Sequence, residues 1–296
     1  MAGPSVFQRS IAPLRRLLPA RFRGDRAIVP VVRLAGAIGI SSPLKPGLTL
    51  ANIARPLERA FSTRNIKAVA LSINSPGGAA AQSHLIYCRI RALADEHKVP
   101  VIAFVEDVAA SGGYMIACAA DEIIADPSSI VGSIGVVGGS FGFDKLIAKW
   151  GIERRLYTAG ERKVTLDPFL PENPDDVERL RGIQREIHES FIGLVRGRRG
   201  DKLDSRESAL FSGEYWTGRR GLELGLVDAV GDLRSTLRER YGDKVQMPLI
   251  ADRGFFGRRV QGVSRSDLES LRGTLSLADD AVATLEARAL WARYGL

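Results

Sequence analysis

Short apolar runs alternate along the chain with segments in which apolar residues recur every three or four positions. The runs are rich in strand-forming residues, and those that are apolar almost throughout, such as 99–105, are typical of strands buried on both faces. We place strands at 28–34, 68–74, 99–105, 122–126 and 153–158. Helical spacing marks the segments between the first three of these strands. The alternation predicts an α/β fold with a largely parallel sheet covered by crossover helices.

A long amphipathic helix is predicted to begin at Asn173, because Pro174 and two acidic residues follow in its first turn. Its apolar residues recur at helical spacing as far as Leu194, so we expect the helix to pack along the body of the domain. The basic run at 196–202 has no interleaved aromatic residues, and we interpret it as a solvated helix end. No nucleic-acid partner is expected.

The formal net charge of +8 is concentrated near the ends of the chain and suggests three regions. Residues 1–27 form a basic, flexible leader, which alternatively anchors the chain on an anionic membrane surface. Residues 28–250 form the α/β domain. Residues 251–296 form a helical C-terminal arm that either packs on a neighbouring subunit or folds back on its own domain.

Neither a signal-peptide core nor a membrane-spanning run is recognisable, because the longest apolar stretch near the N-terminus is interrupted by Arg33. We therefore expect a cytoplasmic protein, with peripheral association with the inner membrane left open. Cys88 and Cys118 are too few for a disulfide framework or a metal site, and we interpret both as core residues. No metal and no cofactor are expected.

Two glycine-rich turns, at 72–80 and 109–117, each follow a predicted strand. Open α/β sheets bind ligands at the carboxyl ends of their strands, where backbone N–H groups of glycines can approach a ligand closely. Neither turn contains a nucleotide-binding glycine motif. Ser111 in the second turn is either a nucleophile or part of a small-residue joint between a strand and a helix.

A serine nucleophile needs a base. His84, His97 and His188 fall inside or at the end of predicted helices, where a solvent-facing or capping role is expected, so a serine–histidine pair is disfavoured. Lys163 is the alternative, provided that burial lowers its pKa. The residues alone leave a plain surface lysine open.

Four motifs occur in order: INSPGG at 73–78, ASGGYMIA at 110–117, ADPSSIVGSIGV at 125–136 and WTGRRGLELGLVDAVG at 216–231. With a lysine at 163, the chain resembles the SppA/SohB-type signal peptide peptidase family, whose members are Ser-Lys serine peptidases of the ClpP/crotonase superfamily. The resemblance covers residues 28–242 and implies a ClpP/crotonase-like fold of repeated ββα units. The chain departs from the family's pattern in the residues that flank the lysine, and it shows no recognisable membrane anchor.

The resemblance implies that Ser111 attacks the scissile carbonyl and that Lys163 accepts the serine proton. It implies further that the N–H groups of Gly78 and Gly112 form the oxyanion hole, and that Ser133 orients the lysine. An ordinary turn serine is the alternative for Ser133.

The implied activity is that of a serine endopeptidase that cleaves peptides or unfolded or membrane-derived protein segments as a homo-oligomer. A crotonase-like acyl-CoA enzyme and a catalytically inactive, membrane-associated scaffold are the alternatives.

Overall fold

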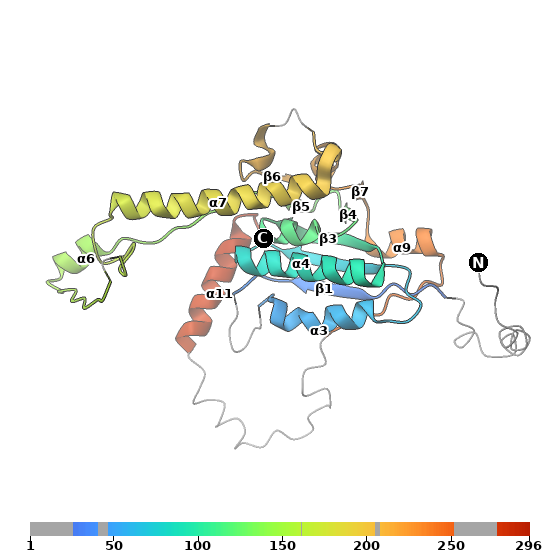
Figure 1. Ribbon diagram of the computed structural model, residues 1–296, viewed down its shortest axis with the longest axis horizontal. Coiled ribbons are helices and arrows are strands. Elements are labelled where there is room, and N and C mark those ends of the chain that lie inside the picture. The colour runs from blue at the N-terminus through green and yellow to red at the C-terminus, as the bar shows by residue number, and fades with distance from the viewer. Residues whose placement is uncertain (1–25, 41–46, 161, 205–207, 252–276) are drawn as a thin grey trace, which may run out of the picture.

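A seven-stranded sheet forms the centre of the protein in a computed structural model that describes residues 26–40, 47–160, 162–204, 208–251 and 277–296 (Figure 1). Its main path runs β1-β2-β3-β4-β7, and β5 pairs with β3 and β6. All pairings are parallel except that of β5 with β6. The strands are β1 (Val31–Ala35), β2 (Val69–Ser75), β3 (Val101–Ala110), β4 (Glu122–Ala125), β5 (Ile130–Gly132), β6 (Tyr215–Thr217) and β7 (Ala229–Val230).

Helices cover the sheet, so the predicted α/β class with a largely parallel sheet is confirmed. They are α3 (Leu50–Phe61), α4 (Ala80–His97), α5 (Gly112–Ala117), α6 (Asp144–Lys149), α7 (Pro174–Arg199), α8 (Gly218–Glu223), α9 (Leu233–Tyr241) and α11 (Leu277–Ala292). Two short 3-10 helices span Gly200–Lys202 and Ser208–Phe211.

The strands bury both faces in two apolar clusters. The larger cluster packs α3, α4 and α5 against one face, with Leu71 and Ile73 of β2 at its centre. The smaller cluster covers the amino-terminal half of the other face, where Phe104 of β3 meets Leu237 of α9. Because successive side chains of a strand point to opposite faces, both packed layers explain why the central strands are apolar at nearly every position.

The polypeptide between β5 and the middle of α7 extends away from the sheet, with α6 near its tip (Figure 1). We call residues 137–173, together with the first half of α7, the α6 projection. The strand predicted at 153–158 is wrong: these residues are exposed and have no regular structure. The run is only partly apolar, since three charged residues precede Leu156 and Tyr157, and none of the described strands pairs with it.

The capping prediction for α7 is confirmed, since the Asn173 side chain accepts the N–H of Asp175 at 2.9 Å. The helix packs on the body only through its second half, where Phe191 and Val195 are buried. In the first half, Ile183 remains 49% exposed. The expected packing along the whole length is therefore wrong.

The basic end of α7 is only in part the solvated helix end that was expected: Arg196 and Lys202 are exposed, whereas Arg199 is buried and Arg198 is half-buried. The Arg199 side chain is 3% exposed and forms a bidentate ion pair with Asp228, at 2.7 and 3.1 Å. Arg198 donates to the carbonyls of Cys118 and Ala120, both at 2.9 Å. These arginines satisfy carbonyl and carboxylate oxygens that the neighbouring loops leave buried.

The predicted leader lies almost wholly outside the described residues, and so does the first part of the C-terminal arm. The division at residues 27 and 250 stays a prediction. Within the described part, α11 contacts the body of its own chain, because Tyr294 beyond its end reaches Ser133. This is the folded-back alternative. None of the helices in the described ranges is long and apolar enough to cross a membrane.

Candidate active site

Ser111 stands between the end of β3 and the start of α5, at the carboxyl edge of the sheet. Its φ of 52° is rare for a non-glycine residue, and its N–H is fixed by the Gly132 carbonyl at 2.8 Å. It lines a cavity of about 1050 Å³. The Ser111 hydroxyl has no hydrogen-bond partner in the described part of the chain, so it is available to a ligand.

The small residues after Ser111 allow α5 to approach its neighbours closely. A Cβ added to Gly113 would stand 2.5 Å from the Ser75 carbonyl oxygen, and one added to Gly112 would stand 2.2 Å from the Ser83 hydroxyl. Tyr114 is fully buried and donates to the Leu226 carbonyl at 2.7 Å. The stretch is thus a packing joint whose rigidity fixes the position of Ser111.

The first glycine turn lies beside Ser111, because β2 and β3 are neighbouring parallel strands. The Gly77 carbonyl accepts the N–H of Ile38, and the Ala79 N–H donates to Ile38, both at 2.8 Å. Ile38 thus bonds to the residues on either side of Gly78, as in a parallel bridge. The N–H of Gly78 itself therefore points away from Ile38.

Gly112 supplies a second N–H at the same cavity. It is the first residue of α5, where helical N–H groups lack intrahelical partners. Both Gly78 and Gly112 line the cavity that contains Ser111, and neither N–H has an acceptor among the residues described. The two backbone donors and the Ser111 hydroxyl therefore line one cavity, and their roles as an oxyanion hole and a nucleophile stay predictions.

Lys163 is exposed on the α6 projection and does not line the Ser111 cavity. Its N–H is held by the Gly160 carbonyl at 3.2 Å, in a turn without regular structure. Within one chain it lacks the apolar enclosure that a neutral amine requires. Its role as the base stays a prediction.

Ser133 lies in the Ser111 cavity, directly after β5. Its φ is 53°, and its N–H donates to the Glu214 carbonyl at 2.7 Å. The hydroxyl accepts a hydrogen bond from the Tyr294 phenol at 3.1 Å. The observed partner of the Ser133 hydroxyl in this chain is therefore a tyrosine, and its contact with Lys163 stays a prediction.

His188 also lines this cavity, which the sequence argument missed. It is half-buried on α7, and its Nε2 lies 3.0 Å from the Ile134 carbonyl oxygen. His84 and His97 are exposed, as expected, and so is Cys88, which was expected in the core. Helical spacing alone could not reveal His188, because its contact joins residues 54 positions apart.

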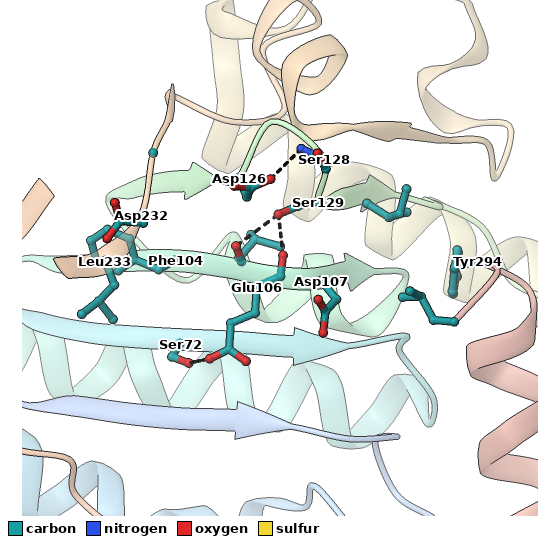
Figure 2. Close-up of a pocket in the computed structure, with 14 residues that line it drawn as sticks. Ser72, Phe104, Glu106, Asp107, Asp126, Ser128, Ser129, Asp232, Leu233 and Tyr294 are labelled. Carbon is teal, nitrogen blue, oxygen red and sulfur yellow. Dashed lines mark hydrogen bonds between the residues drawn. The ribbon is translucent and has the colours of Figure 1, made fainter. Parts of the chain in front are cut away.

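A second cavity of about 540 Å³ lies at the opposite face of β2 and β3 (Figure 2). Glu106 on its floor pairs with Arg33 at 3.0 Å and accepts from Ser72 at 2.5 Å, and Asp107 accepts from Asn74. The described residues contain no cluster of ligating side chains that could hold a metal ion. Tyr294 lines both cavities.

The family model of peptidase family S49 matches residues 94–245. A Brucella abortus protein named Na(+)/H(+) antiporter NhaA is 55% identical over 287 residues, which are 96% of this chain and 39% of that protein. The chloroplastic serine protease SPPA of Arabidopsis thaliana is 33% identical over 71% of this chain and 31% of its own length. A Synechocystis protein that carries a protease name is 30% identical, covering 72% of this chain and 77% of that protein.

The chain thus spans well under half of the first two relatives, and most of the protein named as an antiporter lies outside the match. Among solved structures, a serine-to-alanine mutant of the 1510-N membrane-bound stomatin-specific protease is similar, with 18% identity and a TM-score of 0.46. That similarity covers 75% of this chain and 93% of the solved chain.

Proposed function

Because the chain belongs to peptidase family S49, we propose that it is a serine endopeptidase that cleaves peptides or unfolded protein segments through an acyl-enzyme. Membership of this family, together with the parallel sheet, supports the ClpP/crotonase-like fold expected from the sequence. One observation carries the proposal. The unpartnered hydroxyl of Ser111 shares a cavity with the free N–H groups of Gly78 and Gly112.

The proposed reaction begins when the Ser111 Oγ attacks the scissile carbonyl carbon while Lys163 accepts the hydroxyl proton. The N–H groups of Gly78 and Gly112 donate to the oxyanion that develops on the carbonyl oxygen. Collapse breaks the C–N bond, and the lysine proton passes to the leaving amine. Water then attacks the ester with Lys163 again as base, which releases the acid and restores Ser111.

A second copy of the chain is the proposed source of the lysine. Lys163 is exposed on the α6 projection, and no lysine is among the described residues around Ser111. The same projection exposes large apolar side chains, a surface that a subunit contact would cover. They include Val137, Phe141, Leu146, Trp150, Ile152 and Tyr157. Contact with another copy would bury Lys163 and bring it to a neighbouring Ser111.

Mixing two inactive variants tests the dyad and its arrangement together. We expect Ser111→Ala and Lys163→Ala each to lose cleavage of an unstructured protein, by at least about 10³-fold. Random reassembly of equal amounts pairs an intact serine with an intact lysine at about a quarter of the interfaces, so that share of activity should return. Cleavage retained by Lys163→Ala would remove the lysine from the mechanism, and a silent mixture would refute supply by a second copy.

His188→Gln serves as the matched variant for a serine–histidine mechanism, because His188 is the histidine that lines the cavity. If Lys163 is the base, the His188→Gln variant retains a working dyad. Its rate of protein cleavage then falls much less than that of Lys163→Ala. An inactive, correctly folded His188→Gln beside an active Lys163→Ala would assign the base to histidine.

The crotonase-like alternative does not need the Ser111 hydroxyl, so the same variants separate it from the peptidase. We also propose that the protein acts in the cytoplasm and associates peripherally with the inner membrane. Equal flotation with anionic liposomes, with and without residues 1–24, would exclude anchoring by the leader.

A further inference from the structure

The helix α11 and the residues after it line one side of the Ser111 cavity. They contribute side chains from two turns of the helix and from the segment beyond it, namely Glu286, Ala289, Leu290, Arg293 and Tyr294. Other apolar side chains of α11 do not pack on the body, since Val282 and Leu285 are 54% and 66% exposed. The segment 277–296 therefore covers the cavity without being part of the main apolar core.

Tyr294 makes the contacts that hold this segment in place. Its phenol donates to the Ser133 hydroxyl at 3.1 Å and lies 3.4 Å from the Pro76 carbonyl oxygen. Its ring packs edge-on against Tyr215, with centroids 5.1 Å apart, and the Tyr215 phenol donates to the Arg293 carbonyl. Burial raises the pKa of Tyr294 above its ordinary value, although the hydrogen bond to Ser133 opposes this, so the phenol remains a donor at neutral pH.

These contacts join the two sides of the cleft on which Ser111 depends. Pro76 belongs to the first glycine turn, which presents Gly78. Ser133 follows Gly132, whose carbonyl holds the Ser111 N–H. The Tyr294 side chain therefore bridges the two sides of the cavity that Ser111 lines.

Tyr294 also stands at the junction of two cavities. It lines the Ser111 cavity of about 1050 Å³ and the second cavity of about 540 Å³, where it lies opposite Glu106 and Asp107 (Figure 2). Moving Tyr294 aside would connect the two hollows into one groove across the carboxyl edge of β2 and β3. An extended peptide needs such a groove, whereas a closed pocket would admit only a side chain or a chain end.

We propose that the segment 277–296 is an autoinhibitory plug, in which Tyr294 closes the cleft of the resting chain and is displaced when an extended polypeptide enters. The inference rests on the proposed peptidase function, because that function defines what the cleft admits. A fixed wall of the substrate site is the competing role for the same segment. A plug and a fixed wall predict different effects on access to Ser111 when the Tyr294 contacts are removed.

Access to position 111 can be measured without any catalysis. Ser111→Cys places a thiol there, and Cys88→Ser removes the exposed cysteine. Cys118 does not compete, because burial raises the pKa of its thiol to about 12. The rate of reaction with dithiobis(nitrobenzoate) then reports how open the cleft is.

We expect Tyr294→Ala to raise this rate by about tenfold or more, the effect of losing the phenol hydrogen bond and a ring contact on an opening equilibrium. Tyr294→Phe, which keeps the ring and therefore the fold, should give a smaller increase. Tyr241→Phe on α9 is the matched control and should change nothing, since Tyr241 packs in the separate cluster on the other face. An unchanged rate in both Tyr294 variants would overturn the plug.

Cleavage of unfolded casein by the chain with its native Ser111 separates this inference from the proposed function. The plug predicts that Tyr294→Ala raises kcat/KM by a factor similar to that for thiol access. A lower kcat/KM would overturn the plug in favour of a fixed wall. If no variant cleaves casein although thiol access rises, the plug stands and the peptidase function fails. If every variant cleaves equally and thiol access is constant, the function stands and the plug fails.

Discussion

Replacing Gly78 by alanine should damage the oxyanion hole more than the fold. The added Cβ would stand 2.1 Å from the Ile38 carbonyl oxygen and 2.8 Å from the Ile38 nitrogen, and Gly78 has a φ of 143° that side chains rarely adopt. The turn must therefore shift, and the Gly78 N–H shifts with it. Loss of one oxyanion donor costs about 10²–10³ in kcat. Backbone strain of this kind costs about 1–3 kcal/mol of stability.

The assay pairs cleavage of an unstructured protein with urea unfolding of the same preparation. Gly193→Ala is the matched control, because a Cβ there meets open space on α7 and helix propensity predicts a gain of about 0.5–1 kcal/mol. We expect Gly78→Ala to be folded and at least about 10²-fold less active, and Gly193→Ala to be fully active. A folded Gly78→Ala enzyme with wild-type kcat/KM would refute the assignment of Gly78.

Other predictions concern stability. Asp228→Asn should destabilise the protein by about 3–5 kcal/mol in urea titrations, because Arg199 would stay buried without its carboxylate, whereas Lys202→Ala at the exposed end of the same cluster should cost at most about 1 kcal/mol. Burial alone would raise the pKa of Asp228, but hydrogen bonds from Arg199, Lys202 and the Ile123 N–H hold it below its ordinary value. The stability from this pair is therefore present above the unfolded-state pKa of about 4 and lost as the pH falls through the lower folded-state pKa. If Asp228→Asn keeps the acid sensitivity of the wild type between neutral pH and about pH 3, other carboxylates dominate. Tyr114→Phe should cost about 1–3 kcal/mol by leaving the Leu226 carbonyl buried and unpaired, with no loss of activity per folded molecule.

The sequence was sufficient for the four strands β1 to β4 and for the two glycine turns, but it did not reveal the short strands β5, β6 and β7. Apolar strands at 68–74 and 99–105 predicted neighbouring parallel strands, and parallel strands end at the same edge. Gly78, Ser111 and Gly112 were therefore expected to meet, and they line one cavity. Local capping signals likewise gave the start of α7 at Asn173 correctly.

Contacts between distant segments could not be predicted from such patterns. Arg199 looked like a solvated charge because its partner Asp228 is 29 positions away. The contact of Tyr294 with Ser133 joins residues 161 positions apart, and nothing in the local sequence marks it. The strand predicted at 153–158 is wrong for another reason, because a short run with strand-forming residues forms a strand only where another strand is available to pair with it.

If Ser111 forms an acyl-enzyme, its hydroxyl is a reactive nucleophile that covalent labelling can detect. A fluorophosphonate probe reacts with an activated serine, and peptide mass mapping locates the adduct. We expect one adduct, on Ser111, and we expect Ser111→Ala to lose both the adduct and protein cleavage. An adduct on another residue of an active preparation, or cleavage that persists in Ser111→Ala, would contradict this expectation.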